Sequence, residues 1–145
     1  MTPYARKFVS DEEFELFLKI KDLVTKLPDL DLGLDGSRNK IDLSCHMFAR
    51  AVADIFSLEF VDGYFTIGFQ HSWVLTPNGH VIDVYPVAML GGPILMEARG
   101  FSPARNCYLK MNKNRGYKVP SEEQWFKESV EKIKQKLLEI ISAQL

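Results

Sequence analysis

The sequence predicts an α+β fold in which helices pack on a small antiparallel sheet. Apolar residues recur at helical spacing near both ends of the 145-residue chain, and runs typical of strands occupy residues 58–86 between them. The order helix, helix, strands, helix differs from the regular alternation that builds a parallel sheet. The length fits a single domain, residues 1–145.

The composition limits the function classes. Apolar residues make up 46% and charged residues 26%, which are ordinary globular values, and the net charge of −1 gives no overall attraction to nucleic acid or anionic lipid. No apolar run approaches the roughly 18 residues of a membrane span, and the N-terminus lacks the apolar stretch of a signal peptide. We therefore expect no nucleic-acid or membrane partner. The expected location is the cytoplasm, or outside the cell as an effector exported without a cleaved signal peptide.

The first helix is predicted from a capping box formed by Ser10 and Glu13, followed by apolar residues at helical spacing as far as Leu27. Pro28 should end it. Residues 28–42 are rich in Asp and Gly and predict a long loop.

A second helix is expected from Ser44 through the stretch "CHMFARAVADIF". After the strands, residues 89–106 predict a loop, and "CYLKM" predicts one more strand. Pro120 and a capping box of Ser121 and Gln124 open the last helix. The apolar stripe of that helix consists of Phe126, Val130, Ile133, Leu137 and Ile141.

The stretch "HSWVLTPNGHVID" predicts a β-hairpin with a carboxylate, Asp83, inside an apolar strand, where Asp is normally depleted. Two turns are compatible with "TPNGH". A two-residue Asn-Gly turn would leave His71 and Asp83 on opposite faces of the hairpin. A three-residue loop would pair Thr76 with His80, and His71 and Asp83 would then lie on the same face. We expect the three-residue loop, because proline suits the first central position of a type I turn. Asp83 would then hold and orient the His71 ring.

Cys45 is expected in the first turn of the second helix. Apolar residues follow at +3, +4, +7, +10 and +11, which puts the thiol on the packed face, with His46 and Arg50 on the polar side. A helix N-terminus and a nearby imidazolium both lower the pKa of a cysteine, and the thiolate is the nucleophile. Acyl-transfer chemistry requires this combination of a nucleophile, a base and an orienting carboxylate.

The segments "SCHMFARAVADIF", "FVDGYF" and "HSWVLTPNGHVIDVYP", within residues 43–86, resemble the core of the transglutaminase-like branch of papain-fold cysteine enzymes. The resemblance implies a papain-like domain with Cys45 as nucleophile, His71 as general base and acid, and Asp83 as orienter. It also implies an amide acyl-transfer enzyme without a cofactor that works through a thioester: a hydrolase, a glutamine deamidase or a transglutaminase. Its partner would be a protein or peptide substrate.

Two further residues are candidates for substrate or oxyanion binding. Asn39 lies six residues before Cys45, the spacing at which papain-like enzymes carry an oxyanion donor, and the Cys45 backbone N–H is a second donor. Trp73 is expected to wall the cleft beside the His–Asp pair, or to belong to the core.

Other functions remain open. One alternative is a catalytically inactive papain-like module that binds a protein partner; another is a nucleic-acid or metal-binding domain. A zinc site would draw on Cys45, His46, His71, His80 and Cys107. Only the adjacent Cys45 and His46 come close to ligand spacing, and His80, next to the turn, is expected to be exposed, so we expect no metal. The sequence does not indicate an oligomeric state.

Overall fold

The computed structural model describes residues 8–66, 69–85, 92–98, 107–110 and 118–145. Within these residues the chain forms three helices and a curled antiparallel sheet of five strands, so the α+β prediction is confirmed. The elements are α1 (Asp11–Thr25), α2 (Cys45–Phe56), β1 (Glu59–Phe65), β2 (Phe69–Leu75), β3 (Val81–Asp83), β4 (Ile94–Met96), β5 (Tyr108–Lys110) and α4 (Gln124–Ala143). The strands lie in the order β4-β3-β2-β1-β5.

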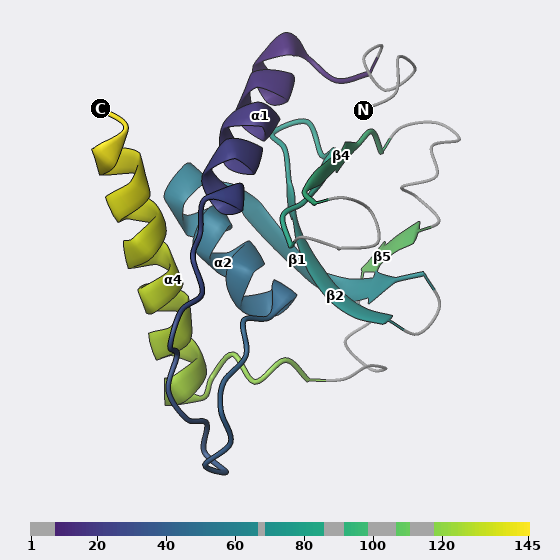
Figure 1. Ribbon diagram of the computed structural model, residues 1–145. Coiled ribbons are helices and arrows are strands. Elements are labelled where there is room, and N and C mark those ends of the chain that lie inside the picture. The colour runs from purple at the N-terminus through teal and green to yellow at the C-terminus, as the bar shows by residue number, and fades with distance from the viewer. Residues whose placement is uncertain (1–7, 67–68, 86–91, 99–106, 111–117) are drawn as a thin grey trace.

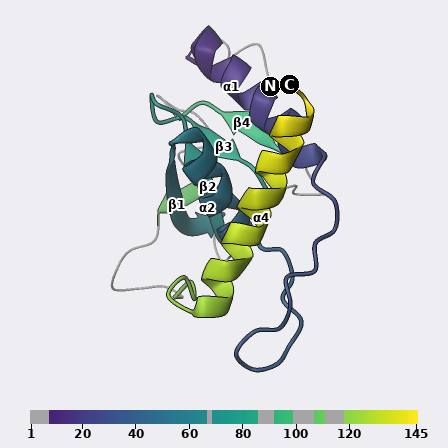
Figure 2. The same cartoon turned by 90° about the vertical axis from the view of Figure 1, so that its left-hand side faces the viewer.

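Helix α2 lies between the sheet and α4 (Figure 1). Figure 2 shows α4 crossing in front of α2 when the molecule is turned by 90°. The buried residues of α2 are Met47, Phe48, Ala49, Ala51, Val52 and Ala53. We expected a single apolar face on this helix. The buried residues extend around more of the helix than that face, because α4 covers the side that the sheet does not. Burial of each large apolar side chain contributes about 1.5–3 kcal/mol to the stability of the fold. Because α2 is covered on both sides, it is the centre of the main core.

The sheet has an apolar cluster on each face. On the face toward α2, Val74 and Ile82 join the main core. A second, smaller cluster on the opposite face contains Val61, Trp73, Val81 and Tyr108. Because strand side chains alternate between faces, His71 and Asp83 lie on this second face, two residues from Trp73 and Val81 respectively.

The hairpin between β2 and β3 has the predicted three-residue loop. The Thr76 N–H donates to the His80 carbonyl at 2.8 Å, and the Gly79 N–H donates to the Thr76 carbonyl at 2.8 Å. Gly79 has φ +83°, the left-handed conformation that this loop requires. The strands continue in the same register, with Val74 opposite Ile82. The register prediction is confirmed, and it places His71 and Asp83 on one face.

The capping box of α1 is also present. The Ser10 hydroxyl accepts a hydrogen bond from the Glu13 N–H at 3.2 Å, and the Glu13 carboxylate accepts one from the Ser10 N–H at 3.4 Å. The same carboxylate accepts a hydrogen bond from the Asn78 side chain at 2.7 Å, which connects α1 to the hairpin loop. Burial alone would raise the pKa of Glu13, but hydrogen bonds from Thr76, Asn78 and the capping serine lower it to about 2.

The predicted bounds of the other elements hold in part. Helix α1 ends at Thr25, before Pro28 as expected, whereas the capping box predicted at Ser121 is wrong. The N-cap of α4 is Glu123, because residues 121–123 form a turn in which the Glu123 N–H donates to the Pro120 carbonyl at 3.2 Å.

The prediction of a loop over residues 89–106 missed β4, a three-residue strand that pairs with β3. Residues 89–91 and 99–106 of that predicted loop lie outside the described residues. The strand predicted near residue 107 is confirmed as β5, which pairs with β1. Residues 28–42 form a long connection, as predicted, with one bridge between Leu34 and Lys40.

Candidate active site

Cys45 is the first residue of α2. Ser44 precedes it as the N-cap and accepts a hydrogen bond from the Met47 N–H at 3.3 Å. The thiol is half-buried and forms no disulfide. The first N–H groups of a helix have no carbonyl partner within the helix and carry its positive dipole end, so this position favours an anionic sulfur.

His71 and Asp83 form the contact that the hairpin register predicted. The His71 Nε2 lies 2.7 Å from Asp83 Oδ2, and the Asp83 side chain is completely buried. A carboxylate accepts hydrogen bonds, so Nε2 carries the proton. The Cys45 thiol also acts on the His71 ring, and its interaction with the ring raises the pKa of His71. Asp83 and Cys45 therefore influence the same imidazole.

These contacts reverse the usual proton affinities of the thiol and the imidazole. Burial alone would raise the pKa of Cys45, but hydrogen bonds and attraction to His46 and His71 lower it to about 6. Burial alone would lower the pKa of His71, but hydrogen bonds with Asp83 and Cys45 raise it to about 9. The ordinary values are about 8.5 and 6.5. At pH 7 the site therefore holds a thiolate beside an imidazolium.

Aromatic side chains surround the His71 ring on the second face of the sheet. Its centroid lies 6.0 Å from that of Phe65, 6.3 Å from that of Trp73 and 6.4 Å from that of Tyr108. Trp73 is only 2% exposed, and with Tyr108 it lines a cavity of about 280 Å³ on this face. Its substrate-binding role remains a prediction.

Tyr108 was not predicted from the sequence as a site residue. Its hydroxyl donates to Asp83 Oδ2 at 2.9 Å, the oxygen that His71 also uses. Burial and the neighbouring Asp83 raise the pKa of Tyr108, so the phenol keeps its proton and remains a donor. Tyr108 therefore helps to fix the carboxylate that orients His71.

A second polar chain connects α2 to the same sheet on its other face. The His46 Nδ1 lies 2.6 Å from the Ser72 hydroxyl, which donates to Asp62 Oδ1 at 2.6 Å. The two terminal nitrogens of Arg50 hold the Asp62 carboxylate at 2.9 and 2.7 Å. We expected His46 and Arg50 on a polar helix side, and the structure packs them against the strands. The feature of the sequence that could have indicated this packing is the pair of polar strand residues Asp62 and Ser72, which lie opposite each other on β1 and β2.

The remaining predicted residues, Asn39 and His80, make other contacts. Asn39 is exposed in the turn closed by the Leu34–Lys40 bridge, and its backbone N–H donates to Asp35 Oδ1 at 2.9 Å. Its role as an oxyanion donor remains a prediction. The expectation that His80 is exposed is wrong, because its ring is completely buried and its Nδ1 accepts a hydrogen bond from the Ala98 N–H at 3.0 Å.

A cavity of about 240 Å³ borders the first turn of α2. Ser44 and His46, the neighbours of Cys45 in the chain, line it, together with Met47 and Phe126 of the main core. Trp125 contributes a half-buried aromatic wall, and charged side chains of the long connection complete the lining: Asp35, Lys40 and Asp42. Cys45 itself is not among the residues that line this cavity.

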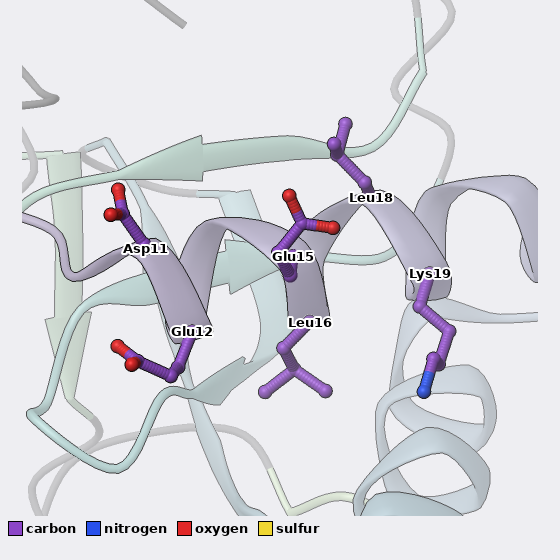
Figure 3. Close-up of a pocket in the computed structure, with 6 residues that line it drawn as sticks. All are labelled: Asp11, Glu12, Glu15, Leu16, Leu18 and Lys19. Carbon is purple, nitrogen blue, oxygen red and sulfur yellow. The ribbon is translucent and has the colours of Figure 1, made fainter.

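A larger cavity, of about 770 Å³, lies along the outer side of α1. Its described lining residues all come from that helix and are Asp11, Glu12, Glu15, Leu16, Leu18 and Lys19 (Figure 3). None of them belongs to the two polar chains around Cys45, so this hollow does not bear on the chemistry of the thiol.

Within the described parts of the chain, no group of three or more His, Cys, Asp or Glu side chains is arranged to hold a metal ion. None of the helices described there is both long and apolar enough to cross a membrane. Comparisons of the chain with protein-family models, with curated protein sequences and with solved structures find no match.

Proposed function

We propose that this protein is a papain-like, cysteine-dependent enzyme that transfers the acyl group of an amide. Cys45 is the nucleophile, His71 the general acid and base, and Asp83 the group that orients His71. The observation that carries the proposal is the His71 ring held 2.7 Å from the buried Asp83 carboxylate, together with the opposite pKa shifts of Cys45 and His71, which favour a proton on the imidazole at neutral pH.

In the proposed reaction the Cys45 thiolate attacks the carbonyl carbon of the amide. The carbonyl oxygen becomes an oxyanion, for which the backbone N–H of Cys45 at the start of α2 is a suitable donor. The C–N bond then breaks, and His71 gives its proton to the leaving amine. A thioester and a neutral His71 remain.

The second half of the reaction removes the acyl group from the sulfur. Neutral His71 takes a proton from water or from a second amine, which attacks the thioester carbonyl, and the thiolate leaves. Water yields hydrolysis or deamidation, and an amine yields transamidation. The cavity lined by Ser44 and His46 is a suitable place for one of these groups, because these two residues flank Cys45 in the chain.

The proposal is tested by incubating the protein with glutamine-containing peptides, with and without hydroxylamine, and analysing the products by mass spectrometry. Cleaved peptides indicate hydrolysis, conversion of Gln to Glu indicates deamidation, and hydroxamate formation indicates transfer to an amine. We expect one of these products from the wild type and none from Cys45→Ala, whereas Cys107→Ala should retain activity.

The thiol supplies an independent measurement. The rate of Cys45 alkylation by iodoacetamide should rise with pH through a midpoint near 6, and His71→Ala should move that midpoint upward. A midpoint near 8.5 that is unaffected by His71→Ala would exclude the proposed activation and favour a binding module.

A further inference from the structure

The cavity on the second face of the sheet begins beside His71. Along β2 the side chains of His71, Trp73 and Leu75 follow one another on this face, at intervals of about 6.6 Å. Trp73 and Leu75 line the cavity, which measures about 280 Å³. The Trp73 ring centroid lies 6.3 Å from that of His71. The indole of Trp73 therefore borders both the cavity and the His71 ring.

Trp73 is held in place from two sides. A Cβ at Gly63 would lie only 2.7 Å from Trp73 Cη2, so the indole passes directly over the glycine. The Tyr108 ring packs edge-on against the indole, with the centroids 5.1 Å apart, and it also lines the cavity. The Tyr108 hydroxyl donates to Asp83 Oδ2 at 2.9 Å. The two aromatic walls of the cavity are therefore fixed by contacts that extend to the carboxylate behind His71.

The rest of the lining combines buried apolar residues with exposed charges. Val61 and Val81 are buried and belong with Trp73 to the smaller apolar cluster. Glu59 and Lys110 are exposed and carry opposite charges, so together they attract neither an acidic nor a basic side chain. A charged group placed against the apolar walls would lose its hydration there. The lining therefore favours an uncharged, apolar occupant.

The volume limits the size of that occupant. Sites for drug-sized ligands usually measure about 300–1,000 Å³, and an apolar cavity of about 150 Å³ can hold a benzene ring. A cavity of about 280 Å³ therefore fits one large side chain, such as that of leucine or phenylalanine. Neighbouring side chains on one side of an extended peptide are as far apart as those on one face of a strand. A peptide whose amide reacts beside His71 can therefore place a nearby side chain in the cavity.

We propose that the cavity walled by Trp73 and Tyr108 is a specificity pocket that takes one large apolar side chain of the peptide substrate. This inference rests on the proposed function, because it places the reacting amide beside His71. The substrate is then a peptide segment with an apolar residue within two positions of the reacting amide. Trp73 and Tyr108 are specificity determinants, since each ring contacts the substrate side chain on one side and lies near the His71 ring on the other.

The test compares two peptides as substrates of the full-length protein. One is acetyl-Gly-Leu-Gln-Leu-Gly-amide, and the other has glycine in place of both leucines. We expect the leucine peptide to have the higher kcat/KM, by about tenfold to a hundredfold, which is the usual effect of an apolar side chain that enters a pocket. Ala98→Phe adds a ring to the lining of the cavity and should abolish this preference. The matched control Ala143→Phe adds the same ring at the exposed end of α4 and should keep it.

Binding is measured separately in Cys45→Ala, which cannot form the thioester. We expect intermolecular nuclear Overhauser effects between the leucine methyl groups of the peptide and the indole of Trp73. The chain has two tryptophans, and the other, Trp125, lines the cavity beside Ser44. Trp125→Phe therefore identifies the signals of Trp73. Thermal unfolding followed by circular dichroism shows whether Ala98→Phe is folded, and if it is not, the Overhauser effects decide alone.

The outcomes distinguish the specificity pocket from the proposed function. If the wild type converts both peptides at equal rates, the proposed function stands and the specificity pocket is wrong. If the methyl groups contact Trp73 in Cys45→Ala but the wild type converts neither peptide, the cavity binds an apolar side chain and the proposed function is wrong. Methyl contacts with Trp125 in place of Trp73 would overturn the inference, as would a leucine preference that persists in folded Ala98→Phe. Absence of both binding and conversion would overturn both proposals.

Discussion

Replacement of Asp83 by asparagine should separate the charge of the buried carboxylate from its shape. The pKa of His71 rises from its ordinary 6.5 to about 9. That difference of roughly 2.5 units corresponds to about 3 kcal/mol in favour of the imidazolium. The hydrogen bond with Asp83 is the largest of the influences that raise it, and burial acts in the opposite direction. In Asp83→Asn we therefore expect the pKa of His71 to fall by about two units or more.

The thiol should respond in turn. With a neutral His71, Cys45 loses an attractive partner, and its pKa should rise from about 6 toward the ordinary value. A rise to about 7.5 would lower the thiolate fraction at pH 7 from about 90% to about 25%, so alkylation at that pH should slow about fourfold. Acyl transfer should fall further, by about a hundredfold or more, because the protonated His71 that serves the leaving group becomes scarce.

The assay is an NMR titration of the His71 ring, identified among the three histidines by the loss of its signal in His71→Gln, together with the alkylation rate of Cys45. Asp54→Asn is the matched control, since it removes a carboxylate from the exposed side of α2, where Asp54 pairs with Lys134. A His71 ring that still titrates above pH 8 in Asp83→Asn would refute the electrostatic reasoning.

Three further predictions concern stability and the surroundings of His71. The low pKa of Glu13 stabilises the fold by about 3 kcal/mol above pH 4.5, and this contribution is lost as the pH falls toward 2. Urea unfolding at several pH values should show this loss in the wild type and in the exposed control Glu12→Gln. The variant Glu13→Gln should not show it. Gly63→Ala should destabilise by about 1–3 kcal/mol in urea unfolding, because a Cβ there meets the Leu109 carbonyl, whereas Gly36→Ala should not. Tyr108→Phe removes a hydrogen bond from Asp83, so the pKa of His71 should rise in the NMR titration, and a fall would contradict the assigned donor.

The hairpin could be predicted because its information is local. A proline followed by Asn and Gly selects one loop length, the loop fixes the register, and the register fixes which residues share a face. The contact between His71 and Asp83 follows from that alternation, at 2.7 Å in the structure. The first turn of α2 was predictable for the same reason, since Ser44 caps it and Cys45 follows directly.

The rest depended on tertiary packing. His46 and Arg50 were expected on the polar side of α2, and the sequence did not show that Asp62 and Ser72 on the strands supply their polar partners. The contribution of Tyr108 required knowing that β5 pairs with β1 at the far edge of the sheet. Helix α4 begins after Ser121 because a turn at Pro120 takes precedence over the expected cap, and such a competition cannot be read from spacing alone.

Strand β2 takes part in both polar chains. His71 contacts Asp83 on one face of the strand, and Ser72, the next residue, contacts His46 in the first turn of α2 on the other. A shift of β2 relative to the first turn of α2 therefore disturbs both imidazoles in a single motion. We expect the reactivity of Cys45 to disappear in the same step in which the backbone amides of β2 lose protection from hydrogen exchange. The reactivity of the thiol would therefore measure whether β2 and the first turn of α2 are still packed together.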